Sequence, residues 1–294
     1  MSVFVQQQGS PCDFSGGDSW VIMTPIEQSI KRKIEAVGTP LKDWDINIYR
    51  GVLTGCNEAF IISSEKRDEI LSNCKSEEEK KRTDELIRPI LRGRDIKRYG
   101  YEWANLWLIN THNGIKGKLE RIHIEDYPAV KAHLDQFWDK IKDRADQGDT
   151  PYNLRNCAYL EEFFKPKVMY PNMTKYIPFY YDTRGFYQND KSFMITGRHI
   201  AFLTAFLNSS IFKFCFLNNF PELQGGTREL RKVFFDKIPV IQIDDKLNEQ
   251  FASLISDMQN NPTVEKAKSI DELLFDVYGL TDAERDVIGF IEIQ

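Results

Sequence analysis

The stretch from Lys165 to Gly197 constrains the fold most, and it reads KPKVMYPNMTKYIPFYYDTRGFYQNDKSFMITG. Its short apolar runs are separated by the turn-forming segments PNMT, DTRG and QND, which predicts a meander of β-hairpins. The next segment, HIAFLTAFLNSSIFKFCFLNNF, is strongly apolar and predicts a helix packed under these strands. Strands followed by a covering helix indicate an α+β fold.

Other periodicities add elements on both sides of this unit. Residues 24–38 predict a helix, because Thr24 can cap it, Pro25 suits its first turn and Gly38 can end it. Strands are predicted over WDINIYRG, AFIISS, LWLINTH and FFDKIPVIQI, and polar helices over SEKRDEILSNC and SEEEKKRTDELI. The segment IEDYPAVKAHLDQFWDKIKDRADQG predicts one helix of about five turns. We therefore predict a flexible segment over residues 1–19, a β-rich domain with packed helices over 20–243, and a helical tail over 244–294.

Charge is distributed unevenly along the chain. The net charge is −5, from 39 Lys and Arg against 44 Asp and Glu. Residues 242–294 contain 12 acidic and four basic residues, so the preceding part is weakly basic. Seven basic residues fall in each of the segments 86–118 and 155–198, against two and four acidic ones. This separation predicts a basic body that can bind a polyanion and an acidic tail.

Several protein classes are disfavoured by what the sequence lacks. The five cysteines are scattered without a CxxC pair, which argues against a zinc knuckle and a disulfide framework. No signal-peptide pattern opens the chain, and no apolar run approaches the roughly 20 residues of a membrane helix. We expect a cytoplasmic protein with no membrane association. No GxSxG, HExxH, Walker or GxGxxG motif is present, so we predict no catalytic residue and no metal site in this chain.

Aromatic and basic residues are interleaved in the β-rich segment, and this pattern favours nucleic-acid binding. Eleven aromatic residues between Tyr152 and Tyr187 accompany five Lys and Arg residues. For any single aromatic, a core position is the more frequent explanation. The loop Gln224–Lys232 offers a tight glycine turn, and Thr227 could cap a helical turn facing phosphate, while a plain solvent loop explains it equally well.

Five segments, taken in order, resemble a known family. They are IYRGVLTGCNEAFIIS, IRPILRGRDIKRYGYEWANLWLINTHNG, KPKVMYPNMT, FYYDTRGFY and LTAFLNSSIFKFCF with GGTRELRKVFFDKIPV. Together they resemble the TaqI-like C-terminal specificity domain, the target-recognition part of type II and IIG restriction–modification enzymes and adenine-specific DNA methyltransferases. The resemblance implies recognition of double-stranded DNA. It also implies an N-terminal methyltransferase or nuclease domain, not seen in this chain, that would bind S-adenosylmethionine; no cofactor is expected in this chain.

The resemblance and the charge pattern together define candidate contacts. Basic residues would position the DNA through its phosphates, and polar loop residues would contact base edges in the major groove. The predicted phosphate contacts are Arg92, Arg94, Lys97, Arg98, Lys116 and Lys118. The predicted base contacts are Arg155, Asn156, Asn172, Lys175, Arg228 and Arg231. Asp95 is expected to pair with a neighbouring arginine and hold a turn.

Two other functions stay open at this point. The chain could be a complete DNA methyltransferase or nuclease whose motifs are not recognisable. It could also be a protein-interaction module whose acidic tail docks a partner. The tail helices could alternatively serve as a spacer beside a separate catalytic domain.

Overall fold

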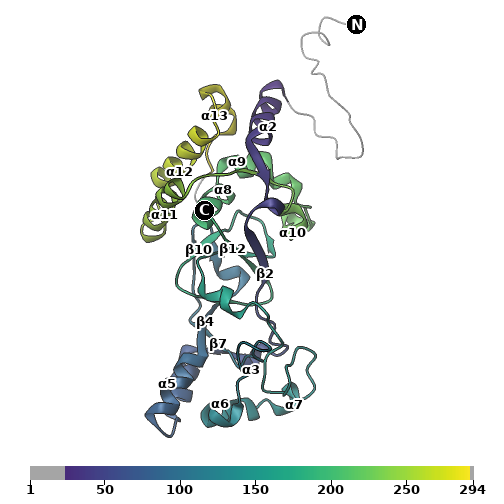
Figure 1. The fold of residues 1–294 in the computed structure, drawn as a ribbon, viewed down its shortest axis with the longest axis vertical. Helices are drawn as coiled ribbons and strands as arrows, with labels where there is room; N and C mark the ends of the chain where they lie inside the picture. The colour runs from purple at the N-terminus through teal and green to yellow at the C-terminus, as the bar shows by residue number, and fades with distance from the viewer. Residues whose placement is uncertain (1–23, 292–294) are drawn as a thin grey trace, which may run out of the picture.

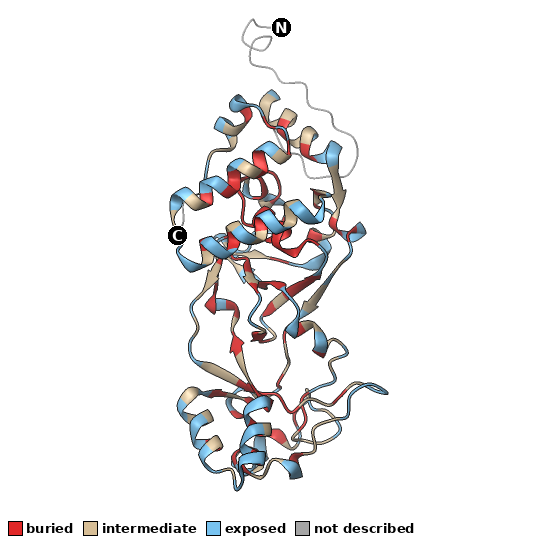
Figure 2. Cartoon of the chain, turned by 60° about the vertical axis from the view of Figure 1, so that its left-hand side comes forward, coloured by how far each residue is buried: buried red, intermediate tan, exposed pale blue. Residues whose placement is uncertain are grey.

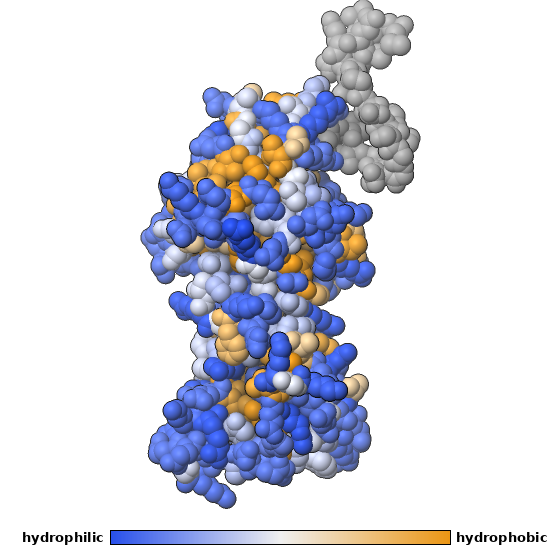
Figure 3. All heavy atoms as spheres, viewed as in Figure 1, coloured by the Kyte–Doolittle hydropathy of each residue, from blue (hydrophilic) through white to orange (hydrophobic). Residues whose placement is uncertain are grey.

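Residues 24–291 of the protein are described by a computed structural model, and they form an elongated molecule of two lobes joined by a narrow waist (Figure 1). The terminal lobe holds both ends of this range and one large hydrophobic core, and the middle lobe, built mostly from residues 52–164, has a separate core. The waist is also visible in the space-filling view (Figure 3). No helix among the described residues is long and apolar enough to cross a membrane.

The terminal lobe is built on an antiparallel four-stranded sheet with the order β10-β8-β12-β2. Its strands are β2 (Ile46–Arg50), β8 (Lys167–Pro171), β10 (Tyr180–Asp182) and β12 (Ser192–Gly197). Strand β8 is buried along its whole length, because Val168 and Tyr170 join the large core while Met169 joins a third cluster with Leu91 and Phe186. A central strand covered on both faces reads as a continuous apolar run.

Helices cover one face of this sheet. Helix α8 (Ile200–Leu207) is buried at every position, because it packs between the sheet strands and helix α11 (Asp245–Asn260), as Figure 2 shows by the buried segments at the centre of this lobe. Helices α9 (Ser210–Cys215), α12 (Val264–Val277) and α13 (Asp282–Ile288) complete the layer. Helix α2 (Pro25–Val37) begins at Thr24 with the predicted cap, reinforced by Glu27, and contacts α13.

The tail helices share the core of the body. Phe251, Ile255 and Leu274 are fully buried in the same cluster as the sheet residues Val168 and Ile195. The boundary that the sequence predicts after residue 243 therefore lies within one continuous hydrophobic core.

The middle lobe contains a second four-stranded sheet with the order β11-β4-β7-β3. Its strands are β3 (Ile61–Ser63), β4 (Ile87–Leu91), β7 (Leu106–Ile109) and β11 (Tyr187–Gln188). Its helices are α3 (Asn57–Phe60), α4 (Ser64–Ser72), α5 (Glu77–Leu86), α6 (Pro128–Asp135) and α7 (Trp138–Ile141). The predicted meander is wrong, because β8 lies between β10 and β12, and β11 pairs in parallel with β4 in this other sheet.

Three two-stranded pairs connect loops. Strand β1 (Gly38–Pro40) pairs with β14 (Pro239–Ile241), β5 (Ile96–Lys97) with β6 (Gly100–Tyr101), and β9 (Met173–Thr174) with β13 (Arg228–Glu229). The last pair ties the connection after β8 to the loop that precedes helix α10 (Lys232–Phe235).

Four predicted elements differ in length. The long helix over residues 124–148 is broken, because Phe137 (φ −108°, ψ 14°) leaves helical geometry between α6 and α7. The apolar helix over 199–220 is two helices, because the Asn208 side chain bonds both backbone groups of Phe179 and Ser209 caps α9. The segment AFIISS is helical up to Phe60, and FFDKIPVIQI is helical up to Phe235.

Candidate nucleic-acid interface

The turn Arg92–Asp95 is the centre of the basic segment in the terminal lobe. The Asp95 carboxylate is buried and accepts hydrogen bonds from the Arg92 backbone N–H (2.8 Å), Nε (2.9 Å) and Nη2 (2.8 Å). These bonds to Asp95 raise the pKa of Arg92 above its ordinary value. The predicted pairing of Asp95 is therefore confirmed, and Arg92 holds the turn. A Cβ on Gly93 would lie 3.0 Å from the Lys191 carbonyl oxygen, so the turn packs closely on its neighbour.

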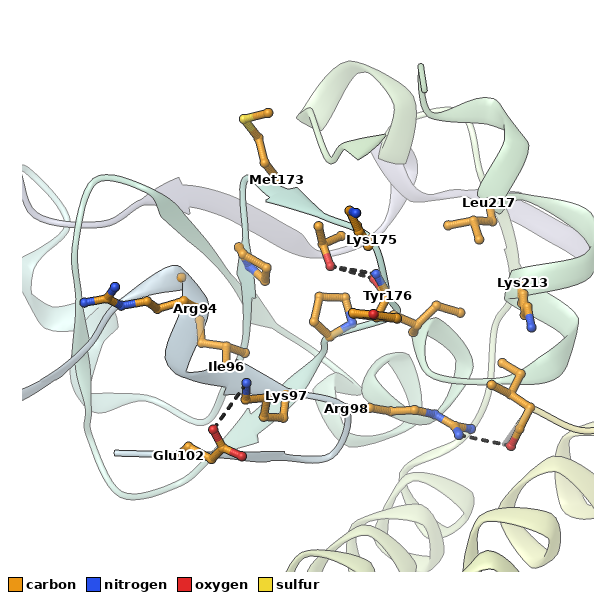
Figure 4. Close-up of a pocket in the computed structure, with 16 residues that line it drawn as sticks. Arg94, Ile96, Lys97, Arg98, Glu102, Met173, Lys175, Tyr176, Lys213 and Leu217 are labelled. Carbon is orange, nitrogen blue, oxygen red and sulfur yellow. Dashed lines mark hydrogen bonds and ion pairs between the residues drawn. The ribbon is translucent and has the colours of Figure 1, made fainter. Parts of the chain in front are cut away.

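A hollow in the terminal lobe lies beside this turn. Figure 4 shows it between the turn, the connection from β8 to β10, and helix α9. Five cationic side chains line it, namely Arg94, Lys97, Arg98, Lys175 and Lys213, together with the aromatic ring of Tyr176. The structure thus brings predicted phosphate contacts and a predicted base contact to one place.

The cations of the hollow are mostly uncompensated. Lys97 lies 3.3 Å from the Glu102 carboxylate, and both side chains are exposed. Among residues 24–291, Arg94, Lys175 and Lys213 form no ion pair or side-chain hydrogen bond. On a chain of net charge −5, three unpaired cations around one hollow create a local positive potential that attracts anions.

The connection from β9 onward is held by local hydrogen bonds. The Thr174 hydroxyl donates to the Tyr176 carbonyl (2.8 Å) and accepts from the Tyr176 N–H (3.0 Å). The half-buried Asn172 accepts a bond from the Leu230 N–H at its carbonyl (2.8 Å). These contacts, with the β9–β13 pairing, fix the exposed side chain of Lys175 at the rim of the hollow.

The predicted base contacts on the glycine loop are engaged within the protein. Arg228 donates to the Phe220 carbonyl (2.8 Å), to Asn218 (3.1 Å) and to Glu222 (3.0 Å), and only 17% of its side chain is exposed. Arg231 pairs with Glu229 at 2.9 Å but stays exposed. The predicted cap at Thr227 is wrong, because strand β13 follows it and the next helix along the chain, α10, begins at Lys232.

Arg98 also lines the hollow, but its guanidinium is hydrogen-bonded within the protein. Its guanidinium donates to the Asn208 carbonyl from Nε (3.1 Å) and Nη2 (2.9 Å), and to the Ile291 carbonyl from Nη1 (3.3 Å). It therefore joins the α8–α9 connection to the end of the tail. Arg98, which the sequence predicts as a phosphate contact, thus has its guanidinium hydrogen-bonded to the protein's own backbone.

A second basic group lies in the middle lobe. A shallow hollow there is lined by Lys116, Lys118, Arg121 and Asn156, and the first two lie on an exposed turn. Asn113 Nδ2 donates to the Asn156 side-chain oxygen (2.5 Å), which leaves the Asn156 amide N–H groups free to donate. The neighbouring Arg155 is exposed and pairs with Asp146 at 3.1 Å.

The twelve predicted contacts fall into two groups in the structure, and each group contains both predicted phosphate contacts and predicted base contacts. Eight lie in the terminal lobe and four in the middle lobe. Four of the first group (Arg94, Lys97, Arg98 and Lys175) line one hollow, and three of the second (Lys116, Lys118 and Asn156) line the other. Lys213 and Tyr176 also line the terminal-lobe hollow but were not among the predicted contacts. Lys213 lies in an apolar helix that showed no functional pattern, whereas Tyr176 was one of the eleven aromatics and could have been selected for its neighbour Lys175.

Most other residues of the aromatic segment build the fold. Phe163, Tyr170, Phe179 and Tyr187 are buried, as expected for core aromatics. Lys167 is also buried, 2.5 Å from Asp182, and burial lowers its pKa while the carboxylate opposes that shift. Asp182 additionally accepts the backbone N–H of Arg184 and of Phe186, both at 2.9 Å. Within residues 24–291, no three His, Cys, Asp or Glu side chains are grouped so that they could hold a metal ion.

Comparison with known proteins agrees with this architecture. Residues 88–240 match the TaqI-like C-terminal specificity domain, and the chain belongs to this family. The fold is similar to the type IIG restriction endonuclease BpuSI, with a TM-score of 0.53 and 14% identity over 87% of this chain and 33% of that one. It is also similar to the type IIL restriction–modification enzyme MmeI, solved in complex with DNA, with a TM-score of 0.57 and 13% identity over 84% of this chain and 35% of that one. This chain thus spans about a third of each of these proteins.

Proposed function

We propose that this chain recognises a specific sequence in double-stranded DNA, as the specificity part of a restriction–modification enzyme. The observation that carries the proposal is the hollow with unpaired Arg94, Lys175 and Lys213, which lies within the residues that match the specificity-domain family. Lys and Arg around a hollow can neutralise DNA phosphates and release their counterions.

In this proposal the two lobes make different contacts with the DNA. The cations of the terminal-lobe hollow position the DNA through its backbone. The middle-lobe group supplies further phosphate contacts from Lys116 and Lys118. Asn156 offers amide donors, which suit acceptor atoms such as O6 and N7 of guanine or O4 of thymine in the major groove.

The experiment is a salt titration of DNA affinity with the complete chain. Each phosphate contact steepens the fall of log K with log salt by about 0.9. We expect the triple variant Arg94→Ala/Lys175→Ala/Lys213→Ala to flatten this slope by about 2.7 and to weaken binding to all duplexes alike.

The matched control removes three exposed cations elsewhere. Lys80, Lys81 and Lys246 are exposed, and none forms an ion pair or side-chain hydrogen bond within the described residues. Their triple alanine variant has the same net charge as the test variant, so it should keep the wild-type slope within about one unit. Equal slopes in the two triple variants, or no binding of any duplex at low salt, would overturn the proposal.

The catalytic part of the parent enzyme is a finer proposal. We infer a separate methyltransferase domain, adenine-specific by family resemblance, that binds S-adenosylmethionine and is positioned by this chain. Incubation of the chain with labelled S-adenosylmethionine and duplex DNA tests this division. Methyl transfer by the chain alone would instead support a complete enzyme with unrecognised motifs.

A further inference from the structure

Tyr176 is a large aromatic side chain held out from a rigid loop. It is 61% exposed, and Met173 on the same connection is 52% exposed. The two Thr174 hydroxyl bonds to the Tyr176 backbone and the pairing of β9 with β13 restrain the loop on both sides. The loop therefore presents an apolar surface that costs little conformational entropy to use in binding.

The face of the Tyr176 ring is available, unlike those of other exposed aromatics. Phe164 is 55% exposed, but Arg88 lies over its ring at 5.3 Å and Tyr187 packs against it. Trp138 is 41% exposed and packs on Tyr152. Within residues 24–291, Tyr176 has no aromatic partner and no cation over its ring.

The charges around Tyr176 indicate the ligand. Figure 4 places Tyr176 near the centre of the hollow, with Arg94 on one side and Lys213 on the other, and Lys175 precedes it in the chain. An exposed aromatic ring flanked by unpaired cations suits a ligand that combines planar rings with phosphates, as a nucleic-acid strand does.

We propose that Tyr176 stacks on the face of a nucleobase at a locally unstacked step of the bound DNA. This inference rests on the proposed function, and it assigns the ring a role that the cations cannot supply. Stacking on a base face tolerates every base, so Tyr176 contributes affinity and local DNA distortion and no direct reading of sequence. Met173, beside it, would contact the same opened step.

The test compares two duplexes of one sequence, one fully paired and one with a single abasic site that opens the stack. The complete chain is titrated with each at low salt, and affinity is measured by fluorescence anisotropy. We expect the wild type to prefer the abasic duplex, and Tyr176→Ala to lose that preference with a roughly 5- to 150-fold fall in affinity for it. The salt slope of Tyr176→Ala should equal that of the wild type, because no charge changes.

Two control variants separate stacking from a structural role. Tyr176→Phe keeps the ring and should retain the preference for the abasic duplex. Phe164→Ala removes a partly exposed ring that already contacts Arg88 and Tyr187, so this variant should behave as wild type. If Tyr176→Ala binds each duplex as tightly as the wild type does, or if the wild type binds both duplexes with the same affinity, the stacking inference is overturned and DNA binding stands. If the wild type binds neither duplex at low salt, both the inference and the proposed function are overturned.

Discussion

Replacing Arg98 by alanine separates the role predicted from the sequence from the role seen in the structure. Arg98 makes three hydrogen bonds to two backbone carbonyls, Asn208 and Ile291, and Asn208 is fully buried. A hydrogen bond from a charged donor contributes about 1.5 kcal/mol or more, and a buried carbonyl left without its donor adds to the loss. The longest of the three bonds, at 3.3 Å, contributes least.

The expected loss of unfolding free energy for Arg98→Ala is about 3 kcal/mol. In a domain of this size, that lowers the melting temperature by roughly 6–12 °C. Urea titration and calorimetry measure both quantities. The salt slope of DNA binding should not change, because the guanidinium is already bonded to two backbone carbonyls. Arg98→Lys keeps the charge but loses the planar fork, so it should recover little of the stability.

The opposite outcome would refute this assignment. If Arg98→Ala unfolds at the wild-type urea concentration and flattens the salt slope by about 0.9, Arg98 is a phosphate contact as the sequence predicted. Arg94→Ala provides the comparison, because its exposed side chain has no partner among the described residues. It should change the slope and leave the melting temperature within about 1–2 °C of the wild type.

Three further predictions follow from single contacts. Lys167→Met leaves the buried Asp182 carboxylate without its partner and should cost about 3–5 kcal/mol in urea unfolding, with partial recovery in Lys167→Met/Asp182→Asn. Burial alone would raise the pKa of Glu284, but hydrogen bonds from Lys33, Thr281 and Ser29 outweigh it and lower the pKa to about 2. Its stabilisation of up to about 3 kcal/mol, absent in Glu284→Gln, should therefore be complete above pH ~4.5 and fade as pH falls toward 2 in pH-dependent unfolding. Asn156→Ala should weaken binding to duplexes selected by the wild-type chain by about 1–3 kcal/mol more than binding to random duplexes, measured by competition, without changing the salt slope. Equal losses of affinity for both kinds of duplex would exclude base reading by Asn156.

Local signals in the sequence predicted the elements whose causes are local. The helix at residues 25–37 follows from Thr24, Pro25 and its apolar stripe, and the structure adds Glu27 to the cap. The pairing of Asp95 with an arginine was predicted from proximity in the chain, and Arg92 is that partner. These features depend on neighbours within four residues, where spacing alone is informative.

Other features depend on distant partners, and the sequence pattern could not supply them. Tyr187 and Gln188 lie between two strands of the terminal-lobe sheet in the chain, but they pair with β4 of the middle-lobe sheet, about a hundred residues earlier. The break at Asn208 arises because its side chain bonds Phe179 from another element. The choice among the arginines of the basic segment is equally non-local, because the fate of Arg98 is decided by carbonyls at positions 208 and 291.

The shared core of the terminal lobe has a consequence for any exchange of specificity between related enzymes. Helix α8 is covered by the strands on one side and by α11 on the other, so Phe251 and Ile255 complete the core of the terminal lobe. A graft that ends at residue 243 would expose that core and remove the Ile291 carbonyl to which Arg98 donates a hydrogen bond. The smallest portable unit is therefore the whole stretch from α2 to Ile291, and chimaeras should be joined at residues outside it.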